Sequence, residues 1–318
     1  MTGAQAVVAM GELMATGKGF HLTLYKRILD GKVELPCLPD VSLRIRQTIA
    51  HSDYHLQDLV QLLLGDPALS GHLLKMADSP LYRQPTPARD LKTAIQRMGA
   101  SATSNIATTY SIKNLFFSRS PQLMQYMREL WHRSLRTAAI CSVLAKHSTV
   151  IEPDQAMLAG LMQEIGCLLL LVHLEDQPDL LNEPSEVYRM FDEVGGDIGV
   201  VLLKFWGLDG LFVDAIRQRN HWLRDSRLPY DLVDLSILAR HLALGHSPQR
   251  FNLPELESMP IYNKSIFALM RMPRGLGLFE HLRPEIEEVL LLLGGSLTPP
   301  PPPTPRRPVI PTLRNRNV

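Results

Sequence analysis

The chain has 318 residues, of which 45% are hydrophobic and 20% charged, and this composition excludes an intrinsically disordered protein. Its 33 basic and 32 acidic residues give a net charge of +1, so no overall field favours a nucleic acid or an anionic membrane as the partner. The longest apolar runs fall well short of the roughly 20 residues that cross a bilayer, and no basic segment precedes the first one. These features predict a soluble, cytoplasmic protein.

Three widely separated cysteines lie in apolar surroundings, and no two of them form a close pair. Because such spacing is typical neither of a disulfide framework nor of a zinc site, we expect buried thiols in a reducing compartment. The three are Cys37, Cys141 and Cys167.

Apolar residues recur at intervals of three and four along the chain, which predicts an all-α fold. In LPCLPD, Pro36 and Pro39 predict an extended segment before a helix that begins near Val41. Asp66 followed by Pro67 predicts a capped helix start, because Asp is a preferred N-cap residue and Pro suits the first helical position.

Further helices are predicted from the same periodicity, with Gly99 as the residue of positive φ after the first of them. The predicted ranges are 91–98, 103–117, 122–146, 154–173, 197–206, 209–220, 232–244, 261–270 and 284–293.

Both ends of the chain differ from this pattern. We expect residues 1–19 to be a flexible N-terminus, and residues 295–318, with consecutive prolines and four arginines, to be a disordered Pro-rich tail. An alternative for the tail is a docking peptide for an aromatic groove or an acidic partner.

Six stretches of the chain form a recognisable series: LPCLPDVSLRI, DPALSGHLLKMADSPLY, LKTAIQRMG, WHRSLRTAA, AGLMQEIGCLLLL and DIGVVLLKFWGL. Together they resemble the HDOD family, the HD-related output domains of bacterial signalling proteins. The resemblance implies an N-terminal helical bundle over residues 20–120, packed on an HD-like helical bundle over residues 121–294. Asp78 departs from the family pattern, where Asn is more frequent.

Catalytic HD domains are metal-dependent phosphohydrolases whose His and Asp ligands come from separate helices. The resemblance aligns this metal site with six positions of the chain, of which only some keep a ligand. They are His132, Gln163, Glu164, Gly195, Asp197 and Arg240. A cation at position 240 would repel a divalent metal, so we interpret the six as a vestigial pocket and expect no metal and no cofactor.

Glu164 requires an explanation, because an unpaired carboxylate in so apolar a stretch is costly. We predict that it forms an ion pair with Arg240, whose guanidinium replaces the positive charge of the metal ion. For Asp197, which follows two glycines, a helix N-cap is the favoured interpretation.

The segment RQRNHWLRDSR is the most basic part of the predicted globule. Arg217, Arg219, His221 and Trp222 form a hypothetical surface for a partner or for single-stranded nucleic acid. Asp225 interrupts the run and the overall charge is balanced, so a solvated helix end is favoured and nucleic-acid binding is not expected.

The resemblance and the altered ligands predict a non-catalytic signal-transduction protein that binds other proteins, through the groove between its two bundles. Two alternatives stay open: a metal-dependent HD-type phosphohydrolase with remodelled ligands, and a nucleotide- or RNA-binding regulator. The sequence does not predict the oligomeric state.

Overall fold

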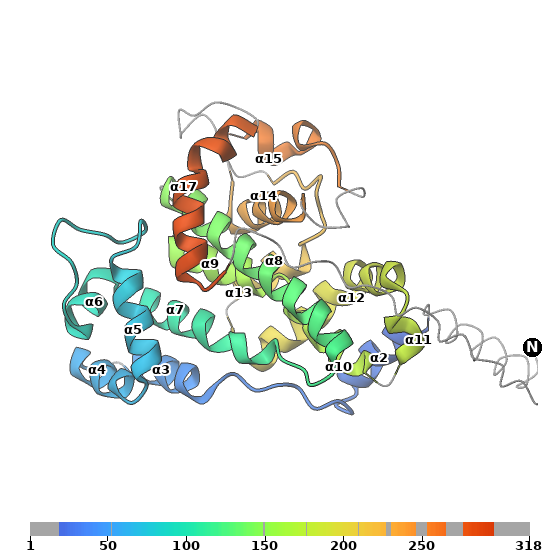
Figure 1. Cartoon of the computed structure of the whole chain (residues 1–318), viewed down its shortest axis with the longest axis horizontal. Helices are drawn as coiled ribbons and strands as arrows, with labels where there is room; N and C mark the ends of the chain where they lie inside the picture. The colour runs from blue at the N-terminus through green and yellow to red at the C-terminus, as the bar shows by residue number, and fades with distance from the viewer. Residues whose placement is uncertain are drawn as a thin grey trace, which may run out of the picture.

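The structure is a computed structural model that describes residues 19–51, 53–148, 150–175, 177–208, 210–226, 230–245, 253–264 and 276–295. Within these ranges helices are the only regular secondary structure, which confirms the all-α prediction (Figure 1). Of the two ends for which we predicted flexibility, residues 1–19 and 295–318, all but Gly19 and Gly295 lie outside the described residues.

The first bundle comprises short helices around an apolar core. They are α3 (Asp40–Ala50), α4 (Leu56–Leu64), α5 (Pro67–Ala77), α6 (Leu91–Met98) and α7 (Ala100–Ile112). Asp66 caps α5 as predicted, because its side chain accepts a hydrogen bond from the backbone N–H of Leu69 at 2.9 Å. Gly99 has a φ of 88°, the positive value predicted for it, and links α6 to α7.

The second bundle surrounds the long helix α8 (Pro121–Lys146). A short 3-10 helix, η1 (Lys113–Leu115), leads into it. Its other elements are α9 (Pro153–Met162), α10 (Ile165–Leu174), α11 (Pro178–Leu181), α12 (Pro184–Phe205), α13 (Gly210–Arg217), α14 (Leu232–Leu244), η3 (Leu256–Ser258), α15 (Pro260–Asn263) and α17 (Leu276–Leu292).

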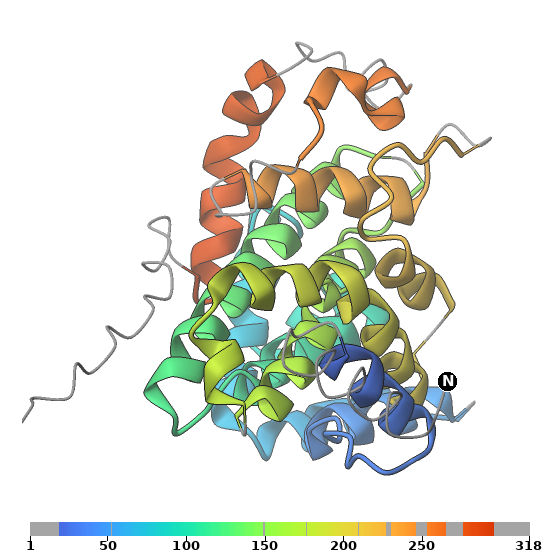
Figure 2. The same cartoon turned by 90° about the vertical axis from the view of Figure 1, so that its right-hand side faces the viewer.

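The two bundles pack through α7 against α9 and through α5 against α17. The helix α2 (Phe20–Leu29), which we expected in the first bundle, packs against α10 and α12 of the second. Both views show α2 in dark blue beside the yellow-green helices (Figures 1 and 2). The segment between α2 and α3 therefore connects one bundle to the other.

The apolar stretch predicted as one helix over residues 154–173 is two helices, because α9 ends before Gln163 and the backbone of Glu164 leaves helical geometry, with φ −109° and ψ 6°. Pro153–Leu174 has the length and composition of a membrane span, and 89% of its apolar window is buried inside the fold. The stretch is therefore core, and its polar pair lies at the break.

Two further predictions were wrong. The helix α12 runs without interruption through Gly195 and Gly196, so the exposed Asp197 lies within a helix and is not an N-cap. Packing of the apolar face of α12 outweighs the low helix propensity of the two glycines. Cys37 is exposed, because it lies in the segment between α2 and α3, whereas Cys141 and Cys167 are buried as predicted.

Candidate functional site

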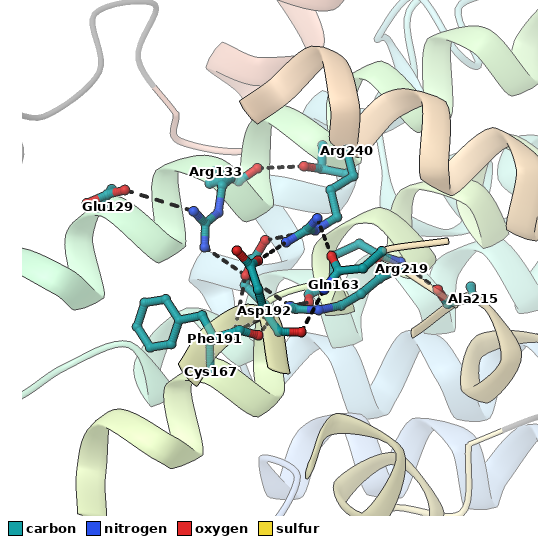
Figure 3. A network of polar contacts seen from close by, with 12 residues as sticks. Glu129, Arg133, Gln163, Cys167, Phe191, Asp192, Ala215, Arg219 and Arg240 are labelled. Carbon is teal, nitrogen blue, oxygen red and sulfur yellow. Dashed lines mark hydrogen bonds and ion pairs between the residues drawn. The ribbon is translucent and has the colours of Figure 1, made fainter. Parts of the chain in front are cut away.

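The carboxylate of Glu164 is completely buried and is held by three arginines. Figure 3 shows these arginines, Arg133, Arg219 and Arg240, converging within one polar network. Arg133 Nη2 lies 2.8 Å and Arg219 Nη1 lies 3.1 Å from its Oε2. Arg240 Nε lies 3.3 Å from its Oε1, so the ion pair that the sequence predicts is present. A single carboxylate therefore binds three guanidinium groups rather than one.

Each arginine comes from a different element. Arg133 lies in the middle of α8, Arg219 in the turn that follows α13, and Arg240 near the end of α14. All three are at most 4% exposed, because their elements pack against α9 and α10 around the break. Tertiary packing thus assembles a set of charges that no local spacing would bring together.

The break between α9 and α10 supplies further acceptors for Arg219. Its Nη1 donates to the carbonyl oxygen of Gln163 and its Nη2 to that of Phe191. The side-chain amide of Gln163 donates to the carbonyl oxygen of Ala159 at 3.2 Å. These hydrogen bonds give partners to buried polar groups of Arg219 and Gln163. Charged side chains are stable in a low-dielectric interior only when they have such partners.

Two more acids lie at the edge of the network. Glu129 Oε1 lies 3.9 Å from Arg133 Nη1, and Asp192 Oδ1 lies 3.8 Å from Arg240 Nη2. Asp192 is 37% exposed, so the network reaches solvent on this side. With Glu164 included, three acids offset the three guanidinium groups.

Burial by itself opposes ionisation of Glu164, but the charges of the three arginines outweigh it and hold the pKa of that carboxyl well below its usual range. Burial, with the like charge of Arg219, lowers the pKa of Arg240 to about 10. Both groups are therefore charged at neutral pH.

The thiol of Cys167 belongs to the same network. It lies 3.4 Å from Glu164 Oε2, and Arg219 Nη2 lies 3.3 Å from its sulfur. Burial raises the pKa of Cys167 to about 12, so this thiol is protonated and donates to the carboxylate.

Gly195, a position of the predicted vestigial pocket, provides space for Arg219. A Cβ at this position would lie 2.6 Å from the sulfur of Cys167 and 2.9 Å from Arg219 Nη2. A side chain at 195 and the guanidinium of Arg219 thus compete for the same volume. The glycine is a requirement of the arginine network.

The structure brings together four of the six predicted pocket residues: Gln163, Glu164, Gly195 and Arg240. His132 is partly exposed and precedes Arg133 on α8, while Asp197 is exposed on α12.

The four residues predicted to form a basic surface do not lie together on one exposed face. Arg219 is 1% exposed, so it cannot contact a nucleic acid and that part of the prediction was wrong. Arg217 is exposed and pairs with Asp214 at 3.0 Å. His221 is exposed, and Trp222 packs with its ring 5.3 Å from the guanidinium carbon of Arg240. Residues 217–226, the described part of the segment, therefore contribute to the core and present no continuous basic face.

The roles of Arg133 and Arg219 in binding Glu164 were not predicted from the sequence. A signal for Arg133 exists: it lies on the α8 face that carries the buried Leu130 and Thr137, three and four positions away. Arg219 has other arginines close to it in the sequence, and the pattern does not distinguish the buried arginine from the exposed ones.

The fold raises the question of a divalent metal, and the residues around Glu164 do not fit one. In the part of the chain that the structure describes, no group of three or more His, Cys, Asp or Glu side chains could hold a metal ion. Glu164 is already bound by three cations, and a further cation would be repelled by them. The three guanidinium groups around this position suit a bound carboxylate rather than a metal ion.

A separate surface feature is a groove of about 480 Å³ between α10 and the two segments that connect the bundles, which we call the interbundle groove. Its lining comes from the segment after α2, from η1 and from α10: Glu34, Leu35, Pro36, Cys37, Leu115, Leu168, Leu169, Val172 and His173. The indole N–H of Trp206 donates to the carbonyl oxygen of Pro36 at 2.7 Å and fixes one wall. The groove is mainly apolar, with Glu34, Cys37 and His173 as its ionisable residues.

Two packed helical bundles, with a buried polar centre at a helix break of the second, define an all-α protein of the HD-like class. The HDOD domain model matches residues 35–222, more than half of the chain, and the chain belongs to the HDOD domain family. The match includes Arg133, Glu164 and Arg219 and ends before Arg240. No curated protein shows significant sequence similarity to the chain.

Solved structures share the fold. A protein from Shewanella amazonensis that bears the name "putative metal-dependent phosphohydrolase" has 22% identity and a TM-score of 0.71, covering 88% of this chain and 98% of its own. An HDOD domain protein of unknown function from Geobacter sulfurreducens has 22% identity and a TM-score of 0.60, covering 86% and 97%. At these identities the likeness concerns the fold alone.

Proposed function

We propose that this HDOD protein is a non-catalytic, cytoplasmic regulator of bacterial signal transduction that acts by binding other proteins. The observation that carries the proposal is the binding of Glu164 by Arg133, Arg219 and Arg240. This centre uses its charges to hold its own elements together. Glu164, the acid at the position of the metal site, is held by three guanidinium groups and is not available to bind a metal ion or to activate water.

The interbundle groove supports the second part of the proposal. Val172 is 46% exposed in it, and Leu35 and Leu115 are only partly buried. Apolar side chains in a concave surface fit a peptide or helix that presents an apolar face. The partner is therefore expected to insert apolar side chains into this groove.

A metal and activity assay tests the absence of catalysis. Purified full-length protein is incubated with Mn²⁺, Fe²⁺ or Zn²⁺, passed over a desalting column, and assayed for bound metal and for hydrolysis of bis-p-nitrophenyl phosphate. We expect neither stoichiometric metal nor turnover. Stoichiometric metal with turnover that Glu164→Ala abolishes would establish the phosphohydrolase alternative instead.

A matched pair of exposed valines tests the binding surface. Val172→Asp places a charge in the groove, and Val150→Asp places the same charge at a position 68% exposed between α8 and α9. In affinity capture from cells of the source organism, a partner that uses the groove is retained by the wild type and by Val150→Asp, and lost by Val172→Asp. Equal retention by both variants would remove the groove from the proposal.

A further inference from the structure

A buried carboxylate lies where the two bundles meet, in the packing of α7 against α9. Asp154 is on the first turn of α9 and is 5% exposed. Its Oδ2 accepts a hydrogen bond from Asn105 Nδ2 of α7 at 2.7 Å. Asn105 Oδ1 in turn accepts one from Arg46 Nη2 of α3 at 3.4 Å. A chain of three polar side chains therefore crosses from the first bundle into the second.

Asp154 and Glu164 are both buried, but only Glu164 is bound by cations. Among the described residues no Lys, Arg or His forms an ion pair with Asp154, and its side-chain partner Asn105 is a neutral amide. A buried carboxylate ion with one neutral partner is costly, because the amide replaces only part of its hydration. Burial of Asp154 in this contact therefore favours the neutral acid.

The ionisable groups around Asp154 do not reverse this preference. Arg46 is a cation, but it reaches Asp154 only through Asn105. Glu152, at the start of the same helix, adds a like charge, and Tyr82, from the loop after α5, has a buried hydroxyl with no hydrogen-bond partner among the described residues. The described parts of α8, α13 and α14 also pack on α9 and supply no ion pair to Asp154. Burial consequently raises the pKa of Asp154 above its ordinary value.

The rest of the interface between the bundles is also polar. Arg83 Nη2 lies 2.9 Å from Glu288 Oε2 of α17, and both side chains are about half exposed. The buried residues of α7 include six that are polar: Thr103, Ser104, Asn105, Thr108, Thr109 and Ser111. Polar interfaces between units of one chain permit relative motion of those units.

We propose that the contact between α7 and α9 is proton-dependent: it is closed when Asp154 is neutral, and it opens more often when Asp154 is ionised. Because burial raises the pKa of Asp154 in the closed form, the closed form binds this proton more tightly than the open form, in which the carboxyl faces water. Acid therefore favours the closed form. This contribution is lost as the pH rises through the raised pKa.

Opening of this contact would change the interbundle groove. The 3-10 helix η1 follows α7 directly, and its Leu115 lines the groove. The segment from Glu34 to Cys37, which also lines it, leads into α3. A shift of α3 and α7 would move both linings relative to α10, so the affinity of a partner would depend on pH. This consequence rests on the proposed function, whereas the proton-dependent contact does not.

Thiol labelling of the full chain measures the opening. Thr109 lies one turn after Asn105 on the same face of α7 and is 1% exposed, so Thr109→Cys places a protected thiol of similar size there. The exposed Cys37 gives the rate of an accessible thiol, and the buried Cys141 and Cys167 report unfolding of the second bundle. The protein reacts with 4,4′-dithiodipyridine between pH 4 and pH 8, and peptide mass mapping without reduction follows each thiol.

We expect the labelling rate at Thr109→Cys, divided by the rate of Cys37, to rise with pH by up to about tenfold per pH unit and then to level off. Adding Asp154→Asn, which keeps an uncharged side chain of the same shape, should remove the rise. Asp179→Asn, at an exposed position of α11, should retain it. Thr103→Cys, on the opposite and fully buried face of α7, should stay protected at every pH.

Three results would overturn the proposal. The first is an unchanged rise after Asp154→Asn, and the second is a relative rate at Thr109→Cys that does not depend on pH. The third is labelling of Thr109→Cys in step with Thr103→Cys or with Cys141, because one of the bundles would then be unfolding.

The two proposals fail separately, because the labelling experiment uses no partner. If labelling depends on Asp154 while no captured partner depends on Val172, the proposed function fails and the proton-dependent contact stands. If a partner depends on Val172 while labelling does not depend on Asp154, the proposed function stands without this regulation.

Discussion

Arg240 Nε lies 3.3 Å from Glu164 Oε1, across 76 positions of sequence, and both side chains are completely buried. Arg240 also donates to Asn220 at 2.8 Å through Nη1 and contacts the ring of Trp222. The pair therefore links α14 to the break between α9 and α10 and to the turn after α13.

Replacing Arg240 with Ala should lower the free energy of unfolding by about 3 kcal/mol, because the buried carboxylate of Glu164 loses one of its three cations. Urea denaturation measures the change. Arg217→Ala is the control, since Arg217 is exposed and forms a surface pair with Asp214; its effect should stay within about 0.5 kcal/mol. Equal stability of the two variants would contradict a structural role for the network.

Two glycine substitutions should have opposite signs. A Cβ on Gly166 would lie 1.9 Å from the carbonyl oxygen of Gly195, so Gly166→Ala should force α10 and α12 apart and cost about 3 kcal/mol. Gly71 lies inside α5, and apart from its own helix no atom of the described residues lies within 4 Å of its Cβ position, so Gly71→Ala should stabilise by about 0.5–1 kcal/mol. Thermal unfolding of both variants measures the two changes in stability. A Gly71→Ala protein less stable than the wild type would contradict the prediction.

His72 should make stability fall in mild acid. Burial, with a smaller effect of Lys75, lowers the pKa of His72 to about 4 from 6.5. As the pH falls, the imidazole of His72 is therefore protonated in the unfolded chain before it is protonated in the folded protein. The contribution of neutral His72 to stability is fully present above pH 6.5 and is lost as the pH falls toward 4. Relative to His72→Gln, the wild type should lose about 2 kcal/mol more between pH 8 and pH 5. Parallel stability curves for the two proteins would show that His72 does not titrate in this way.

Removal of divalent metal should leave the fold unchanged. Because Glu164 is held by guanidinium groups, dialysis against EDTA should shift the midpoint of thermal unfolding by no more than about 1 °C, and added Mn²⁺ or Zn²⁺ should not raise it. Differential scanning calorimetry checks this. A rise in the midpoint that scales with metal concentration would mean that an ion binds the folded state.

The helices themselves were predictable wherever local chemistry determines them. Asp66 with Pro67 marks the start of α5, and the prediction for α14, residues 232–244, matches its observed bounds. The break at Gln163 and Glu164 was not predictable from periodicity, because apolar residues continue on both sides of it. Hydrogen bonds from Arg219, 55 positions away from Glu164, stabilise it.

The candidate site was predictable only in part. A carboxylate in an apolar stretch requires a cation, and the resemblance to a metal site indicated Arg240. The chemistry of Glu164 did not reveal how many cations it binds. Arg133 and Arg219 are ordinary helix-surface residues by composition, and only the packing of α8 and α13 around α9 turns them inward.

The arginine network also constrains how the molecule opens. Detaching α8, α14 or the turn after α13 alone would leave a carboxylate or guanidinium in the interior without its counterion. Partial unfolding of any one of these segments is therefore more costly than its own contacts suggest. Amide hydrogens in all three should exchange together with those of α9, in one subglobal opening event, while α4 and α6 exchange independently.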